Sequence, residues 1–238
     1  MEYNTIHLSQ KELFILETPL FQYESLTGKW FFAPLGSLYH PRKPNYFSSA
    51  RGFLLRNKLI CSILATTDEF EMRETDADAI IADYLMLPGE KHLKEIFSKL
   101  NKPVIISVGF GLTKTSKLPG LAKKFELLGA AGILTGRMIP NPILEKICSE
   151  CSVPVIASVG TNSNEIASRI NAGAYAIVLN GKNISTALIN FLNDSYPNIP
   201  VIVDGGKSEN IIVKSIESGA DAVIYKPCIL FEERRGDT

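Results

Sequence analysis

The sequence predicts a single (β/α)8 TIM barrel of the α/β class, preceded by an aromatic-rich N-terminal extension. The main observation is a repeat, in which a strand-like run, a helix-like stretch and a second strand-like run occur four times along the chain. Three of these units begin at Pro103, Pro154 and Pro200, so successive units lie 51 and 46 residues apart, the length of two strand–helix pairs. Four units of two strands make the eight strands of this fold.

The strands expected in each unit are short and rich in Val and Ile on both faces, as is typical of parallel strands that are covered by helices. The first strands are expected at 58–62, 103–107, 154–158 and 200–204, and the second strands at 76–83, 129–136, 173–180 and 219–226. Helical spacing of apolar residues predicts helices at 68–75, 89–100, 116–128, 141–151, 162–172, 183–194 and 208–218, with a short closing helix at 227–233.

Size and composition narrow the class of protein. A chain of 238 residues suits one barrel domain, expected at 58–238, with the extension at 1–57. Lys plus Arg (25) equals Asp plus Glu (25), which argues against a nucleic-acid partner, because such a partner needs a basic surface. No apolar run approaches the roughly 20 residues of a membrane span, and the N-terminus lacks a signal-peptide pattern. We therefore expect a cytoplasmic protein without a membrane partner.

The extension is dense in aromatic residues between positions 28 and 53 and is interrupted by prolines, which opposes long regular elements. One interpretation is a packed cap that closes the barrel floor or forms the contact of a homo-oligomer. The alternative is a lid that brings His40, Arg42 or Arg51 over the barrel mouth.

Strand alternation predicts which side chains point into the barrel, because successive residues of a strand face opposite sides. If Asp204 faces inward, the same register in the other first strands places a layer of isoleucines below a layer of polar residues. The isoleucines would be Ile60, Ile105, Ile156 and Ile202, and the polar residues Ser62, Ser107, Ser158 and Asp204. A polar layer above an apolar one predicts the floor of a hydrated pocket at the C-terminal face, where the active sites of this fold lie.

The second strands end in Asp83, Gly136, Asn180 and Lys226. An outward Lys226 would place a charge under the helices, which is costly, so we expect it to face the mouth beside Asp83 and Asp204. Arg137 and Lys182 would lie just above, in the loops. We predict Asp83 or Asp204 as a general base and Lys226 as an electrophile or anion clamp. The alternative is a structural ring of ion pairs.

Gly205, Gly206 and Lys207 lie between a predicted strand and a predicted helix. Glycine lets the backbone approach an anion closely, and phosphate sites are frequent at this corner of the fold. We therefore expect a phosphate group to contact the two glycine amides, Lys207 and Lys226. The alternative is that the glycines only form a tight turn from strand to helix.

Parts of the chain resemble known phosphate-binding TIM barrels. The runs 199–206 and 219–224 are similar to the matching segments of IMP dehydrogenases, which implies that the aspartate of the first run holds ribose hydroxyls and that its glycines hold phosphate. The order of segments over 59–227 resembles the glycerol-operon antiterminator family, whose members are regulators. The chain departs from the dehydrogenases after the last strand, where Lys226 and Pro227 stand in place of Gly and Ser.

Metal and cofactor chemistry has little support in the sequence. Cys148 and Cys151 form a C-x-x-C motif inside a predicted helix, but a zinc site needs two further ligands at suitable spacing. None of the three histidines falls at the C-terminal end of a predicted strand. We predict neither a metal nor a resident cofactor, with flavin mononucleotide as an alternative ligand of the phosphate corner.

Taken together, these patterns predict an enzyme of the lyase, isomerase or aldolase type that acts on a small phosphorylated metabolite. The alternative is a non-catalytic regulator that senses such a metabolite, as the antiterminator resemblance implies. A barrel retained only as a scaffold is a third hypothesis.

Overall fold

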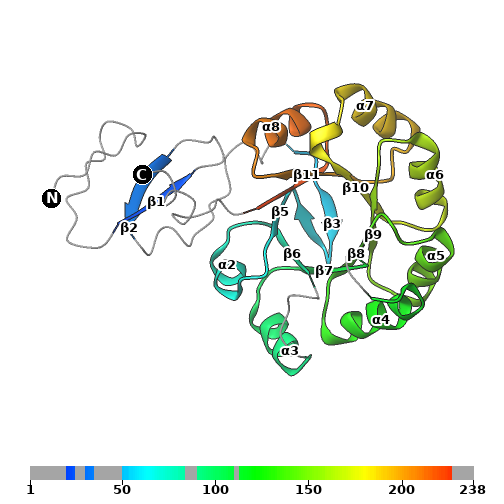
Figure 1. The fold of residues 1–238 in the computed structure, drawn as a ribbon, viewed down its shortest axis with the longest axis horizontal. Helices are drawn as coiled ribbons and strands as arrows, with labels where there is room; N and C mark the ends of the chain where they lie inside the picture. Colours follow the sequence, from blue (N-terminus) through cyan, green and yellow to red (C-terminus); the bar gives the residue numbers. More distant parts are fainter. Residues whose placement is uncertain (1–19, 25–29, 35–49, 84–89, 110–112, 227–238) are drawn as a thin grey trace.

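The computed structural model describes residues 20–24, 30–34, 50–83, 90–109 and 113–226. Its central feature is a closed barrel of eight parallel strands, in the order β10-β11-β12-β5-β6-β7-β8-β9 (Figure 1). Helices surround the barrel on the outside and run between successive strands. The predicted (β/α)8 fold is therefore confirmed.

The elements follow the predicted units closely. The barrel strands are β5 (Ser62–Ala65), β6 (Ala79–Asp83), β7 (Val104–Val108), β8 (Gly132–Thr135), β9 (Val155–Val159), β10 (Ala176–Asn180), β11 (Val201–Gly206) and β12 (Ala222–Tyr225). The helices are α2 (Glu69–Glu74), α3 (Glu90–Lys99), α4 (Leu118–Leu128), α5 (Asn141–Glu150), α6 (Ser163–Asn171), α7 (Thr186–Ser195) and α8 (Glu209–Glu217), with short 3-10 turns η3 (Thr115–Lys117) and η4 (Gly181–Asn183). The closing helix predicted at 227–233 lies outside the described residues.

The first barrel strand is displaced from its predicted position. Residues 58–60 form β4 (Lys58–Ile60), which pairs antiparallel with β3 (Phe53–Leu55), and the barrel strand begins at Ser62 instead of ending there. The physical reason is a tight hairpin turn at Arg56 and Asn57, whose φ angles of 49° and 62° suit a two-residue type I′ turn. The inward isoleucine of this strand is therefore Ile63 rather than Ile60, and Ala65 replaces Ser62 in the layer above.

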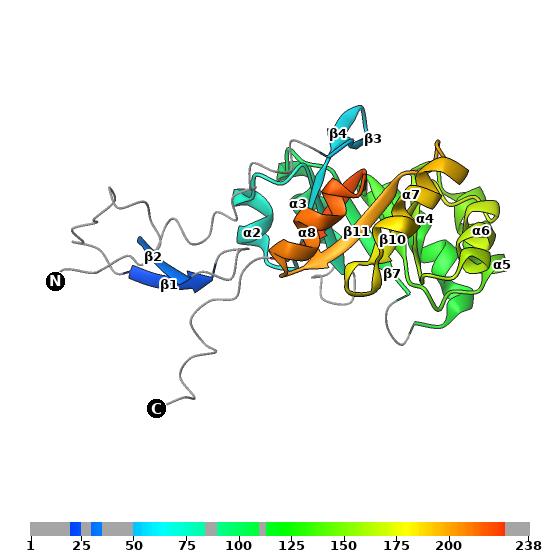
Figure 2. The same cartoon turned by 90° about the horizontal axis from the view of Figure 1, so that it is seen from above.

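The β3–β4 hairpin closes the floor of the barrel (Figure 2). Phe53, Leu55 and Ile60 are buried and belong to the same apolar cluster as the interior strand residues. This cluster also holds three predicted inward isoleucines, Ile105, Ile156 and Ile202. Burial of this many branched side chains is the main force that holds the barrel together.

Basic side chains fix the hairpin and the floor to the ends of helices. Arg56 Nη2 donates to the backbone oxygens of Gly129 and Ala130, at 2.9 Å each, where α4 ends. Lys58 donates to the oxygen of Asn101, just after α3, and Lys102 donates to that of Thr75, which caps α2. Cations at helix C-termini bond to free carbonyls and interact favourably with the helix dipole. These contacts therefore stabilise the floor of the barrel.

The lid hypothesis named His40, Arg42 and Arg51, of which the structure describes only Arg51. Arg51 lies at the floor, where its Nε is 3.3 Å from Asp221 Oδ1, and so it does not reach the mouth as the lid hypothesis expected. His40 and Arg42 lie outside the described residues. Farther upstream, β1 (Leu20–Glu24) and β2 (Trp30–Pro34) form a separate antiparallel pair.

Candidate active site at the barrel mouth

A cavity of about 430 Å³ lies at the carboxyl ends of the barrel strands. Its lining residues are Ala65, Thr66, Thr67, Ile81, Asp83, Ser107, Leu134, Ser158, Val178, Asp204, Ile224 and Lys226. Small-molecule sites are typically concave, largely apolar and fitted with a few convergent polar groups. The cavity has this character and lies at the face of the barrel where the sequence predicted a site.

The charged groups occupy one half of the cavity wall. Asp204 comes from β11, Lys226 directly follows β12, and Asp83 ends β6, while β5 lies between β12 and β6. Lys226 therefore lies between the two carboxylates around the barrel. The opposite half carries neutral groups, the hydroxyls of Ser107 and Ser158 and the apolar side chains of Leu134 and Val178.

The first barrel strand begins at Ser62 instead of ending there, and this displacement changes which residues line the site. Ser62 was predicted to line the pocket, but it is fully buried at the floor, where its Oγ donates to Asp78 Oδ2 at 3.0 Å. Ala65 and Thr67 take the place of Ser62 at the mouth, and sequence reasoning missed both. The pairing of β5 with β6 could have placed them, because Ala65 lies opposite Ile81 in that pair.

Thr66 also lines the cavity and connects it to the helix that follows. Its hydroxyl donates to Glu71 on α2, and its oxygen accepts the N–H of Asp68 at 3.1 Å. Burial raises the pKa of the Glu71 carboxyl above its ordinary value. These bonds hold the β5–α2 connection in one shape at the cavity edge.

The glycine pair that ends β11 has structural reasons for its sequence. A Cβ on Gly205 would lie 2.4 Å from Ile212 Cγ1, so only glycine lets α8 pack this close. Gly206 has φ +57, and its N–H donates to Asp204 Oδ1 at 3.0 Å. Neither glycine lines the cavity, and Lys207 is exposed. The geometry favours the tight-turn interpretation over a cradle of free amides.

Two further predicted pocket residues, Asn180 and Lys182, lie away from the cavity lining. Asn180 Oδ1 accepts the N–H of Lys182 at 3.0 Å and so caps the short turn η4, which leaves both residues on the surface. Gly136 is buried and donates its N–H to the oxygen of Val108 at 3.0 Å.

Arg137 is engaged in an ion pair outside the mouth cavity. Its Nε and Nη2 each lie 2.8 Å from a carboxylate oxygen of Glu165, and Glu165 Oε1 also accepts the N–H of Gly160 at 3.0 Å. The Arg137 hydrogen bonds keep the pKa of Glu165 below its ordinary value. A Cβ on Gly160 would lie 2.5 Å from Arg137 Nη2, so this glycine makes room for the pair.

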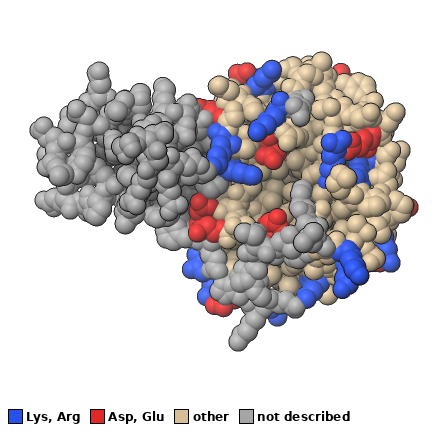
Figure 3. All heavy atoms as spheres, viewed as in Figure 1, with Lys and Arg blue, Asp and Glu red and all other residues tan. Residues whose placement is uncertain are grey.

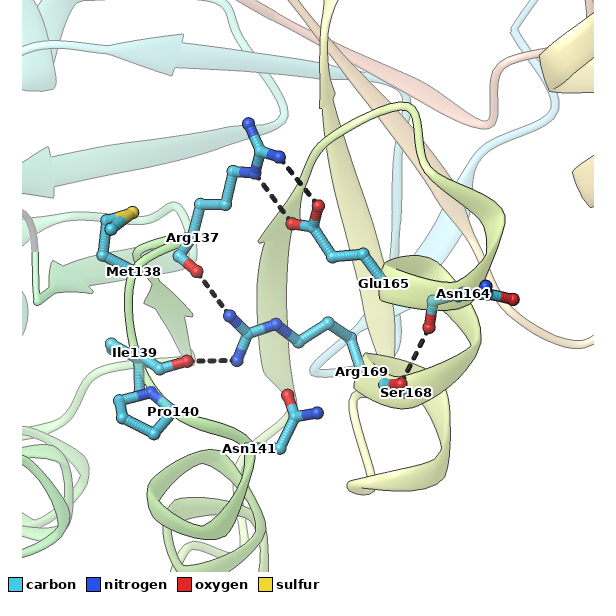
Figure 4. Close-up of a pocket in the computed structure, with 9 residues that line it drawn as sticks. All are labelled: Arg137, Met138, Ile139, Pro140, Asn141, Asn164, Glu165, Ser168 and Arg169. Carbon is cyan, nitrogen blue, oxygen red and sulfur yellow. Dashed lines mark hydrogen bonds and ion pairs between the residues drawn. The ribbon is translucent and has the colours of Figure 1, made fainter.

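The Arg137 pair borders a surface groove of about 660 Å³ between the β8–α5 and β9–α6 connections (Figure 4). The buried Arg169 reaches across it and donates to the backbone oxygens of Ile139 and Arg137. The polar groups of the groove therefore mainly tie two loops together. Arg137 contributes to these links through its side chain, which binds Glu165, and through its backbone oxygen, which binds Arg169.

The described residues contain no group of three or more His, Cys, Asp or Glu side chains placed to hold a metal ion. Cys148 and Cys151 lie at the end of α5, and burial raises the pKa of each thiol to about 11. In the same part of the chain, no helix is long and apolar enough to cross a membrane. On the face shown in Figure 3, basic and acidic atoms are interspersed, without a continuous basic stripe.

Comparisons with known proteins give structural matches only. No protein-family model matches the chain, and no curated protein matches it in sequence. The type I 3-dehydroquinate dehydratase of Clostridium difficile is similar in structure, with a TM-score of 0.59 at 15% identity over 75% of this chain and 90% of that chain. A phosphoenolpyruvate phosphomutase from Streptomyces platensis matches with a TM-score of 0.55 at 17% identity, over 70% and 76% of the two chains.

A 2,3-dimethylmalate lyase of the PEP mutase/isocitrate lyase superfamily is also similar, with a TM-score of 0.55 at 13% identity, over 70% of this chain and 75% of that chain. At these identities the similarity concerns the fold. Of the resemblance stated from the sequence, the comparisons support the TIM-barrel fold. The chain is a (β/α)8 barrel with a cavity at the carboxyl ends of its strands that is lined in part by charged side chains.

Proposed function

We propose that the protein is an enzyme of the lyase or aldolase type, which cleaves or forms a bond next to a carbonyl group of a small phosphorylated metabolite. The observation that carries this proposal is the position of Lys226 between Asp83 and Asp204 in one cavity. A cation flanked by two carboxylates supplies an electrophile and a base to the same bound molecule. The solved structures of similar fold include a lyase, a dehydratase and a phosphomutase, which supports this reaction class.

Each group has a defined part in the proposed reaction. One carboxylate takes the proton of a substrate hydroxyl, and the adjacent carbon–carbon bond breaks. The bonding electron pair passes to the carbonyl oxygen, which becomes an enolate beside the Lys226 ammonium. The carboxylic acid then returns its proton to the carbon of the enolate, and the two fragments leave as carbonyl compounds, one of which carries the phosphate.

The cavity floor favours this chemistry. Leu134, Val178 and Ile224 line it below the charged groups and belong to the buried interior cluster. Apolar surroundings lower the local dielectric and strengthen the attraction between Lys226 and an enolate oxygen. Asp204 lines the cavity, and the Gly206 N–H holds its Oδ1, which fixes the carboxylate relative to the backbone.

The phosphate group of the substrate is proposed to lie at the rim near β11. Lys226 and the exposed Lys207 supply two cations there. The Gly206 amide already serves Asp204, so the side-chain charges rather than the turn amides would hold the phosphate. Phosphate affinity is therefore expected to depend on ionic strength.

The first test is a thermal-shift comparison of phosphorylated sugars and short acids with their unphosphorylated forms. A ligand at roughly 100 times its Kd adds about 2.7 kcal/mol to the free energy of unfolding, which corresponds to a rise in Tm of roughly 5–10 °C at this size. We expect the rise in the wild type and its loss in Lys226→Ala. The matched control is Lys182→Ala, because Lys182 is an exposed lysine outside the cavity.

Turnover distinguishes the enzyme from a sensor of the same ligand. For a ligand that passes the first test, we expect aldol cleavage by the wild type and a fall in kcat of roughly 10²–10⁴ in Asp83→Asn or Asp204→Asn. The variant with the larger fall identifies the base. Binding without any bond cleavage, at a range of pH values, would instead favour the regulator hypothesis.

A further inference from the structure

One small region of the cavity wall differs from the rest, namely the position of Ala65 below Lys226 and Asp83. Strand β5 pairs with β12 through Leu64 and Tyr225, and with β6 through Ala65 and Ile81. Ala65 therefore lies between the strand that carries Lys226 and the strand that carries Asp83. All three residues line the mouth cavity.

The other strands of the same layer carry larger, polar side chains. The residues that correspond to Ala65 on β7, β9 and β11 are Ser107, Ser158 and Asp204. Only β5 presents a single methyl group at this level. The wall is therefore recessed at Ala65, whose own side chain has no hydrogen-bonding group; Thr66 and Thr67, which follow it, also line the cavity.

Two apolar side chains flank Ala65 in this recess. Ile81 and Ile224, on the two neighbouring strands, line the cavity and are 8% and 4% exposed. Ala65 packs against the interior cluster to which both isoleucines belong. The side chains of Ala65, Ile81 and Ile224 offer no hydrogen-bonding group to a hydroxyl placed against them, whereas a hydrocarbon group would gain contacts with all three.

From this arrangement we infer that the recess formed by Ala65, Ile81 and Ile224 is a subsite for an unbranched methyl or methylene group, and that Ala65 determines this specificity. The inference deepens the proposed function and rests on it for one point, that the adjacent carbonyl oxygen lies at Lys226. Asp83 comes from the strand next to that of Ala65, whereas Asp204 lies two strands away. Asp83 is therefore the carboxylate nearer to the carbon held in the recess.

The rest of the substrate then points the other way. The opposite half of the cavity carries the hydroxyls of Ser107 and Ser158, with Leu134 between them and Val178 on the strand after Ser158. Hydroxyl groups of a substrate find partners there and not in the recess. The substrate class is thus a carbonyl compound with a short, unbranched alkyl group on one side of the carbonyl and a hydroxylated fragment on the other.

The test uses simple 2-oxo acids that differ only in the group beside the carbonyl, namely pyruvate, 2-oxobutanoate and 3-methyl-2-oxobutanoate. Binding is followed by NMR of protein labelled at the isoleucine δ1 methyl groups, with the Ile81 and Ile224 signals assigned from Ile→Val variants. We expect pyruvate and 2-oxobutanoate to shift these two signals, and the branched acid to bind roughly tenfold more weakly or worse.

Three substitutions at one position sharpen the test. Ala65→Val fills the recess, and it should weaken pyruvate binding roughly tenfold. Ala65→Gly should improve binding of the branched acid relative to pyruvate, and Ala65→Ser should keep the size preference. Ser158→Ala, on the opposite wall, is the control that should leave the size preference unchanged.

Equal binding of the three acids, or a size preference that survives Ala65→Val unaltered, would overturn the inference. So would the absence of any shift of the Ile81 and Ile224 signals at tens of millimolar acid. The proposed function fails in a different way, by affinities that are indifferent to Lys226→Ala or by the lack of turnover. In that event the size preference at Ala65 would still be measured.

Discussion

The carboxylate of Asp204 accepts the N–H of Gly206 at 3.0 Å, across the turn that leads from β11 to α8. This bond uses an amide that a phosphate cradle would require. It also fixes one carboxylate of the candidate site relative to the backbone. The Gly205–Gly206 pair is thus explained by packing and by turn conformation, and the charge of Asp204 opposes a second anion at the same spot.

The two glycines of this turn should respond differently to alanine. Gly206→Ala places a Cβ in open space and leaves only the cost of a left-handed φ of +57, about 1 kcal/mol. Gly205→Ala forces a Cβ to within 2.4 Å of Ile212 Cγ1, and we expect a loss of about 2–3 kcal/mol. Urea unfolding of the two variants measures the difference. Equal and small losses, with loss of phosphate binding in both, would restore the cradle interpretation.

Much of the fold could be predicted because it depends on local periodicity. The helix predicted at 208–218 is observed as Glu209–Glu217, and the inward positions Ser107, Ser158 and Asp204 follow from period-two alternation. Lys226 and Asp83 reach the cavity for the same reason. Alternation is sufficient wherever the end of a strand is marked by proline or by a change of composition.

What could not be predicted depends on contacts between distant residues. The hairpin that displaces the first strand has Arg56 and Asn57 at its turn, without the glycine that usually marks one, and Arg56 is held by carbonyls 73 and 74 residues away. Arg137 was expected over the mouth, but its side chain binds Glu165, which lies 28 residues later in the chain. Neither contact leaves a local pattern in the sequence.

The Arg137–Glu165 pair predicts an acid-sensitive part of the stability. Because the folded-state pKa of Glu165 lies below its ordinary value of 4.5, its stabilising contribution is present above that value and is lost as the pH falls through the folded pKa. We therefore expect wild-type stability to fall more steeply between about pH 5 and pH 3 than that of Glu165→Gln. Chemical unfolding across this range measures both.

The control for this titration is Glu150→Gln, because Glu150 lies on the exposed side of α5, 3.7 Å from Lys146. It should lose stability with acid in parallel with the wild type. Parallel curves for all three proteins would show that the Arg137–Glu165 bond does not form in solution.

Arg56 combines an unfavourable backbone conformation with a stabilising side chain. Its φ of 49° costs a non-glycine residue about 1 kcal/mol, while its guanidinium holds two carbonyls at the end of α4. Arg56→Ala loses the bonds and keeps the strain, whereas Arg56→Gly loses the bonds and relieves the strain. We expect the alanine variant to be the less stable by about 1 kcal/mol in urea unfolding. The reverse order would mean that the turn is not left-handed.

The two thiols of the C-x-x-C motif should react slowly with alkylating reagents. Both thiols have a pKa near 11, because they are partly buried near the C-terminal end of α5. At pH 7.5 the thiolate fraction is then far below that of a free cysteine, and alkylation of Cys148 and Cys151 by iodoacetamide should be roughly 10–100-fold slower. Peptide mass spectrometry measures the rates, with guanidinium-unfolded protein as the control. Rapid labelling in the folded protein would indicate a reactive pair.

Asp78 should be among the most important polar residues of the barrel floor. Its Oδ2 accepts the N–H groups of Cys61 and Ser62 at 2.9 Å and the Ser62 hydroxyl at 3.0 Å, where β5 begins. The matching residue of the last unit, Asp221, accepts the Val201 N–H at 2.8 Å, so the repeat uses an aspartate twice to fix the start of a strand.

Asp78→Ala leaves two backbone donors without their acceptor, and each such loss is worth about 1–3 kcal/mol. We expect the free energy of unfolding to fall by about 2–4 kcal/mol and Tm by roughly 5–15 °C. Asp76→Ala, an exposed neighbour, should change it by less than about 0.5 kcal/mol. Ser62→Ala removes only the hydroxyl bond and should cost about 1 kcal/mol. A small loss in Asp78→Ala, no larger than that of Asp76→Ala, would contradict these floor contacts and favour the mouth position that the repeat first gave Ser62.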